Sequence, residues 1–129
     1  MDLLRYPRAA ARLDGVRVLV VDDEILIALD IEATFLEAGA EAVILCLTLS
    51  EALSAAAAEN LSVATLDVRL GRETSEAVAA LLYERGIPFI FYSGQSLPGL
   101  IRDKWPLSRV VAKPAEPRQL VEAVVDLIR

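Results

Sequence analysis

The stretch Ser62-Val63-Ala64-Thr65-Leu66-Asp67 is a short, mostly apolar run that ends on a single carboxylate. Its length and composition predict a buried strand. A buried strand does not tolerate a charge inside it, so we expect Asp67 to lie where the strand leaves the core. In an open parallel sheet that place is the carboxyl edge, where ligands bind.

Two other apolar runs also end on charged residues. Residues 16–21 are followed by Asp22 and Asp23, and residues 108–112 are followed by Lys113 and Pro114. If all three runs are parallel strands of one sheet, three carboxylates and one ammonium meet at the same rim.

Apolar runs and helical patterns alternate along the whole chain. Strands are predicted over residues 16–21, 42–47, 62–67, 87–92 and 108–112. Helices are predicted over about 24–38, 48–59, 74–85, 96–105 and 116–128, the fourth short or irregular, and residues 68–73 are predicted to form a loop. This alternation predicts a three-layer, doubly wound α/β domain with a parallel sheet and helices on both faces.

The bulk composition limits the classes of function. A chain of 129 residues with 55% hydrophobic residues predicts one packed domain. We assign residues 1–14 to an N-terminal extension and residues 15–129 to the domain. The net charge of −6 disfavours a nucleic-acid-binding role. No apolar run reaches the roughly 20 residues of a membrane span, and no secretory signal is recognisable, so cytoplasm is the default expectation.

The carboxylates at the predicted rim suggest a metal site. The sequence has no histidine and one cysteine, which removes Ser-His and Cys-His catalysis and the usual zinc sites. Asp22 and Asp23 are adjacent like charges, which a cation would neutralise, and clustered carboxylates suit Mg²⁺. The alternative is that one of the two caps the following helix, which would leave Asp67 and Lys113 unexplained.

Lys113 and Ser93 are the other candidate binding residues. The Lys113 ammonium can pair with a carboxylate or with a phosphate, and the alternative is an ordinary salt bridge at a strand end. The Ser93 hydroxyl follows the fourth run and could donate to an anionic oxygen. The alternative for Ser93 is a plain Ser-Gly turn.

These residues, in this order and each after its own strand, resemble the receiver domain of bacterial two-component response regulators over about residues 15–129. The resemblance implies a flavodoxin-like (βα)5 fold with strand order 2-1-3-4-5, an order taken from the family and not from the residues. It also implies a single-domain signalling phosphoacceptor and not a conventional enzyme.

The resemblance assigns a role to each residue. Asp67 would be the phosphoacceptor, Ser93 and Lys113 would bind the other phosphoryl oxygens, and the Lys113–Pro114 peptide bond would be cis. A Mg²⁺ ion would be held by four groups: Asp22, Asp23, Asp67 and the backbone carbonyl of Arg69. The partners would be a sensor histidine kinase or a histidine phosphotransfer protein.

The chain departs from the usual receiver pattern at the position of its aromatic switch residue, which is Val110 here. Residues 91–95, Phe-Tyr-Ser-Gly-Gln, partly resemble a divergent receiver group with a Phe-x-Thr-Gly sequence that lacks this aromatic. Together with Pro98 and Gly99, this predicts that residues 94–107 form the mobile switch region.

Two other functions remain open. One is a receiver-like adaptor that binds partners without phosphorylation. The other is a metal-dependent phosphotransferase or phosphatase that acts on a small substrate through Asp67. It is disfavoured because Arg69 lies where aspartate-nucleophile phosphatases have a second aspartate. The apolar surplus of the helix over 24–38 indicates either a surface for a histidine-bearing partner helix or a wide buried face. The last helix is a candidate homodimer surface.

Overall fold

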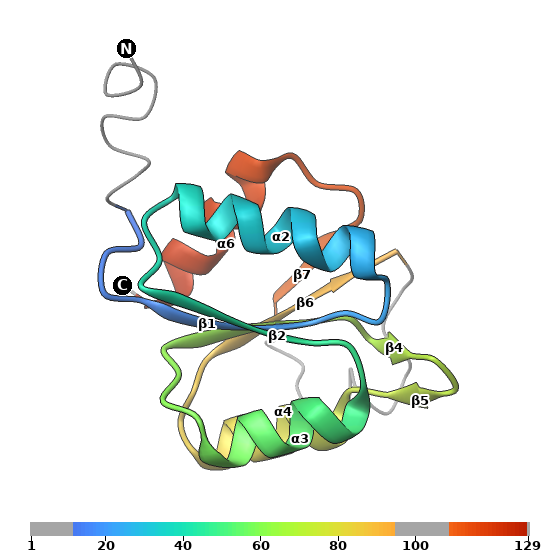
Figure 1. Cartoon of the computed structure of the whole chain (residues 1–129). Coiled ribbons are helices and arrows are strands. Elements are labelled where there is room, and N and C mark those ends of the chain that lie inside the picture. Colours follow the sequence, from blue (N-terminus) through green and yellow to red (C-terminus); the bar gives the residue numbers. More distant parts are fainter. Residues whose placement is uncertain (1–11, 95–108, 129) are drawn as a thin grey trace.

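A computed structural model describes residues 12–94 and 109–128. Its main sheet has five strands: β1 (Arg17–Val21), β2 (Ala42–Cys46), β3 (Val63–Leu66), β6 (Phe89–Ser93) and β7 (Arg109–Ala112). They lie in the order β2-β1-β3-β6-β7, and every neighbouring pair is parallel (Figure 1). Numbered by chain position within this sheet, the order is 2-1-3-4-5, which confirms the expected flavodoxin-like architecture.

Helices cover both faces of the sheet. The helices α2 (Ile25–Glu37) and α6 (Pro117–Ile128) lie on one face, and α3 (Leu49–Ala58) and α4 (Glu76–Glu84) lie on the other (Figure 1). The helix predicted over 96–105 and nearly all of the predicted switch region fall outside the described residues. Within the described ranges, no helix combines the length and apolar character needed to cross a membrane.

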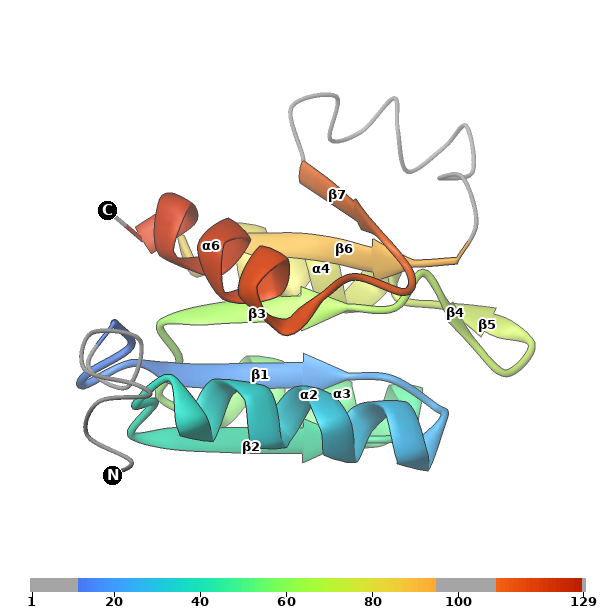
Figure 2. The same cartoon turned by 90° about the horizontal axis from the view of Figure 1, so that it is seen from above.

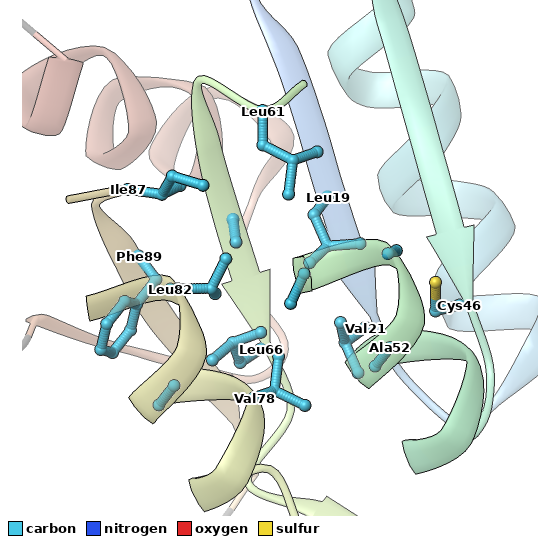
Figure 3. Packing of buried hydrophobic residues seen from close by; sticks show 14 of the residues in the cluster. Leu19, Val21, Cys46, Ala52, Leu61, Leu66, Val78, Leu82, Ile87 and Phe89 are labelled. Atoms are coloured by element: carbon cyan, nitrogen blue, oxygen red, sulfur yellow. The ribbon is translucent and has the colours of Figure 1, made fainter. Parts of the chain in front are cut away.

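Each face of the sheet has its own hydrophobic core. Leu19, Val21 and Leu66 point to the α3 and α4 side, where they pack with Leu82 (Figure 3). Val18 and Val20, which alternate with Leu19 and Val21 along β1, belong to the core under α2 and α6. Successive strand residues point to opposite faces. A central strand covered on both sides therefore needs the continuous apolar run that the sequence shows.

The segment after β3 differs from the predicted loop. It contains a small antiparallel ribbon of β4 (Arg69–Leu70) and β5 (Glu73–Thr74). Gly71 has a φ of +65° at the turn, a conformation that glycine adopts without strain. Leu70 is buried in the α3 and α4 core, so the ribbon is anchored to the domain. Two-residue strands have too little periodicity to be predicted from sequence.

Residues just before β1 pack onto the domain. Leu13 is completely buried, and its backbone N–H donates to the carbonyl of Ala38 at the end of α2 (3.0 Å). Arg12 forms an ion pair with Glu122 of α6. The boundary between an extension and the domain at residue 15 stays a prediction, but residues 12–14 contact the folded body.

The apolar surpluses of α2 and α6 lie in different places. On α2, four large apolar side chains are exposed: Ile25, Leu26, Leu29 and Leu36. On α6, by contrast, most of the apolar side chains are buried in the core: Leu120, Val121, Val124 and Val125. The surplus on α2 is therefore available to a partner, whereas that on α6 mainly stabilises the fold.

Candidate functional site

Asp22 and Asp67 lie side by side at the carboxyl edge of the sheet. Asp22 directly follows β1, and its N–H donates to the Cys46 carbonyl of β2 (3.1 Å). Asp67 directly follows β3, and its N–H donates to the Val21 carbonyl of β1 (2.8 Å). Figure 2 shows that the ends of β1, β3 and β6 point the same way. The backbone hydrogen bonds between the parallel strands therefore continue to Asp22 and Asp67 and hold the two residues beside each other.

Lys113 bridges these two carboxylates. Its Nζ lies 2.7 Å from Asp22 Oδ2 and 3.0 Å from Asp67 Oδ2. Its backbone N–H donates to the Ser93 carbonyl (3.0 Å), which ties the end of β7 to the end of β6. The lysine side chain is 12% exposed and that of Asp22 only 1%, so the three charges form a largely buried cluster.

Burial and charge have opposite effects on this cluster. Burial raises the pKa of Asp67 above its ordinary value, although the hydrogen bond and charge of Lys113 lower it. For Lys113 burial acts to lower the pKa, but hydrogen bonds and charge from Asp22 and Asp67 outweigh it and raise the pKa above its ordinary value. Lys113 therefore stays charged at neutral pH, and an additional cation would relieve the desolvated Asp67 carboxylate.

An open cleft of about 350 Å³ lies beside this cluster. Its lining residues come from the segments at the carboxyl ends of β1, β3, β6 and β7: Asp23, Glu24, Asp67, Arg69, Ser93, Gly94 and Lys113. Asp23 is exposed there, and its Oδ2 accepts a hydrogen bond from the Gly71 N–H of the β4–β5 ribbon (2.9 Å). All the site residues selected from the sequence line this cleft, except Asp22, which contacts Lys113 from a buried position.

Four carboxylates could take part in binding a cation. One oxygen from each of Asp22, Asp23, Glu24 and Asp67 lies within 4.8 Å of all the others. Oxygen donors with several carboxylates fit Mg²⁺. Sequence reasoning missed Glu24, although it continues the acidic run of Asp22 and Asp23. Its side chain is 63% exposed, and its Oε1 lies 4.0 Å from Lys113 Nζ.

The capping alternative for Asp22 is not what the structure shows, because the N-cap residue of α2 is Glu24 and no side chain caps this helix. Oδ1 of Asp22 accepts a hydrogen bond from the Glu24 N–H at the start of α2 (2.9 Å), while Oδ2 contacts Lys113. One carboxylate thus holds the turn that leads into α2 and joins the charged cluster. Lys113 also forms the salt bridge that was the alternative to phosphate binding, with Asp22 and Asp67 as its partners.

Three other features bear on the resemblance. The Lys113–Pro114 peptide bond is cis, as the resemblance implied. Val110, at the position of the missing aromatic, is 43% exposed on β7. Sequence reasoning assigned no role to Tyr92, yet its hydroxyl accepts a hydrogen bond from the Ala115 N–H (3.0 Å) and its ring centre lies 5.5 Å from Lys113 Nζ.

The structure closely matches known receiver structures. A response regulator receiver protein from Sinorhizobium medicae WSM419 superimposes with a TM-score of 0.77 and 26% identity, covering 90% of this chain and 96% of that one. The chain has the fold of a response regulator receiver domain. Two further receiver-fold structures agree: Vibrio cholerae chemotaxis protein CheY4 (TM-score 0.77, 23% identity, 88% and 98% covered) and a CheY-like receiver domain protein from Methanospirillum hungatei JF-1 (0.76, 23%, 85% and 90%).

The receiver fold is recognised here through structure. No protein-family model matches the sequence, and no curated protein matches it significantly. The matching receiver structures are aligned over nearly their full lengths, so the likeness covers the whole domain and not one motif. The membership of the divergent Phe-x-Thr-Gly group stays a prediction.

Proposed function

We propose that this receiver domain accepts a phosphoryl group on Asp67 in a two-component or phosphorelay system. The observation that carries the proposal is the position of Lys113 Nζ, 2.7 Å from Asp22 and 3.0 Å from Asp67, beside an open acidic cleft. The cleft gives a phosphodonor access to the Asp67 carboxylate, and the fixed Lys113 ammonium can neutralise the charge of the phosphoryl oxygens.

The reaction needs little covalent work from the protein. A carboxylate oxygen of Asp67 attacks the phosphorus of a phosphohistidine on a sensor kinase or phosphotransfer protein. A new O–P bond forms, the P–N bond breaks, and its electron pair returns to the imidazole nitrogen. Lys113 would then pair with a phosphoryl oxygen and Ser93 would donate its hydroxyl to another, so that positioning and charge neutralisation provide the catalysis.

The acidic groups around Asp67 would hold a magnesium ion. Asp22, Asp23, Asp67 and the backbone carbonyl of Arg69 are the ligands we propose, and Glu24 is within reach of the same position. Bound Mg²⁺ supplies charge neutralisation between the carboxylates and the incoming phosphoryl oxygens. The raised pKa of Asp67, caused mainly by burial, supports the need for that added positive charge.

The domain would act through protein–protein contacts, beginning with the protein that donates the phosphoryl group. Exposed apolar residues of α2, such as Ile25, Leu26 and Leu29, follow directly after Asp23 and Glu24 at the rim of the cleft. This apolar patch would suit a helix that carries the donor histidine. A role without nucleic acid or membrane and a cytoplasmic location belong to the same proposal. Homodimerisation through α6 does not follow from its apolar side chains, because most of them are buried in the core.

A second candidate function is a receiver-like adaptor that binds partners without phosphorylation. The observation in its favour is Val110, which is 43% exposed on β7 where most receivers carry their aromatic switch. Without that aromatic, the usual transmission of a phosphorylation signal is missing. The charged cluster around Asp67 nevertheless retains the groups needed for phosphoryl transfer, and we therefore place the adaptor second.

Mass spectrometry of the intact protein separates the two functions. After incubation with Mg²⁺ and acetyl phosphate, the wild type should gain the mass of one phosphoryl group, and Asp67→Asn should gain none. Asp14→Asn is the matched control, because Asp14 is an exposed carboxylate before β1, at the opposite edge of the sheet. Mg²⁺ binding without any mass gain in the wild type would favour the adaptor.

A further inference from the structure

Tyr92 contacts the proposed phosphoryl site, which consists of Asp67, Lys113 and Ser93. It has no role in the proposed phosphoryl transfer itself. It lies on β6, directly before Ser93, and is 7% exposed. Its ring lies under the Lys113 ammonium, with 5.5 Å between Nζ and the ring centre. A cation within about 6 Å of the face of an aromatic ring is attracted by it, and more strongly where water is excluded.

The hydroxyl of Tyr92 reaches the loop that carries Lys113. It accepts a hydrogen bond from the backbone N–H of Ala115, two residues after the lysine (3.0 Å). The backbone N–H of Lys113 in turn donates to the Ser93 carbonyl. Tyr92 and Ser93, adjacent residues of β6, therefore hold the loop between β7 and α6 at two points, one on each side of Pro114.

The same residue faces a second cavity. A groove of about 390 Å³ runs between α2 and the start of α6, and Tyr92, Lys113 and Ala115 line it. Lys113 also lines the acidic cleft. Lys113 therefore lines both cavities, and Tyr92 contacts it from the side of the α2–α6 groove.

We propose that Tyr92 is a positioning residue for Lys113 and that it reports the state of the phosphoryl site to the α2–α6 groove. The inference rests on the proposed function. Once Asp67 carries a phosphoryl group, its carboxylate is no longer free to pair with Lys113. The ammonium must turn from Asp67 towards a phosphoryl oxygen, and the ring of Tyr92 is the contact that orients it there. The proposal therefore requires that this contact contribute more in the phosphoryl-bound state than in the free state.

The role differs from that of an ordinary core tyrosine. A purely structural residue contributes equally with and without a phosphoryl group, so its loss lowers stability and affects every ligand alike. A positioning residue affects the phosphoryl group selectively. Binding of beryllofluoride, a phosphoryl mimic, in the presence of Mg²⁺ can therefore be compared with binding of Mg²⁺ alone.

Three variants test the first half of the proposal. Tyr92→Phe keeps the ring and removes the hydroxyl, and it should weaken beryllofluoride binding about threefold. Tyr92→Leu also removes the ring and should weaken it about tenfold. Both should bind Mg²⁺ with affinity within about twofold of wild type, because neither loses a carboxylate. Tyr83→Leu is the matched control, since Tyr83 is 68% exposed on α4 and should leave both affinities unchanged.

Fluorine NMR tests the second half. The chain has three tyrosines, so 3-fluorotyrosine labelling yields a simple spectrum in which Tyr92→Phe identifies one signal. The Tyr92 signal should move when beryllofluoride is added to the Mg²⁺-bound protein, whereas the Tyr83 signal should stay.

The outcomes separate this inference from the proposed function. If wild type does not bind beryllofluoride at all, the proposed function and this inference fail together. If wild type binds it and the Tyr92 variants bind it as tightly, or lose Mg²⁺ and beryllofluoride affinity in parallel, only the inference about Tyr92 is overturned. A Tyr92 signal that does not move on binding would overturn its reporting role.

Discussion

Lys113 Nζ lies 2.7 Å from Oδ2 of Asp22, a carboxylate that is 1% exposed and lies 91 positions earlier in the chain. Two buried charges at this distance stabilise each other only while both are present. The ion pair therefore makes the carboxyl edge of the sheet sensitive to the removal of either partner and to the arrival of another cation.

Replacement of Lys113 by alanine should destabilise the metal-free protein by about 3 kcal/mol, because Asp22 and Asp67 would be left as buried carboxylates without a cation. Mg²⁺ should restore part of this loss. Urea unfolding with and without Mg²⁺ measures both effects. Arg118→Ala removes an exposed cation at the start of α6 and should change stability little. Equal stabilities of Lys113→Ala and wild type without metal would contradict the buried ion pair.

Asp67→Asn should be more stable than wild type at pH 7 without Mg²⁺. Burial raises the folded-state pKa of Asp67 above its ordinary 3.8. The folded protein therefore holds the proton more tightly than the unfolded chain, and the resulting stability is present below pH 3.8 and lost as the pH rises through the folded-state pKa. Asparagine does not ionise, so Asp67→Asn does not lose this stability at pH 7. The difference in stability between Asp67→Asn and wild type should therefore shrink on acidification. A constant difference from pH 3 to 7 would argue against this account.

Asp23→Asn should weaken Mg²⁺ binding at least tenfold, because it removes a charged oxygen ligand that faces the open cleft. The comparison is Glu24→Gln, which should have a smaller effect, because the Glu24 side chain is 63% exposed and lies 4.0 Å from Lys113. Isothermal titration calorimetry measures both affinities. If Glu24→Gln weakens Mg²⁺ binding more than Asp23→Asn does, then Glu24 and not Asp23 is the ligand.

Cys46 should react slowly with iodoacetamide in the folded protein. Burial, together with the nearby charges of Glu51 and Glu59, raises the pKa of its thiol to about 11. Because the thiolate is the reactive form, the alkylation rate should increase about tenfold for each pH unit between 8 and 10. The unfolded protein in denaturant is the reference and should react much faster at pH 8. Equal rates in the two states would show that Cys46 is accessible.

The predicted strands succeeded because a strand covered on both faces requires an uninterrupted apolar run. Residues 18–21 form such a run and residues 63–66 nearly do, and the charged residues that follow them had to lie at the edge of the sheet. The location of Asp22, Asp67 and Lys113 at one rim was therefore predictable from sequence alone. The β4–β5 ribbon was not, because four strand residues around Gly71 are too few to show a period.

By itself the sequence determined the strands, the helices that the structure describes and the edge at which the charged residues gather. Only the tertiary structure decided which groups touch. It brought the Tyr92 ring to Lys113 and added Glu24 to the carboxylates. It also let Asp22 bind both the Glu24 backbone before α2 and the Lys113 side chain. The reason is that hydrophobic periodicity specifies which face of an element is buried, whereas side-chain contacts depend on strand order and register, and a shift of one residue turns every side chain to the other face.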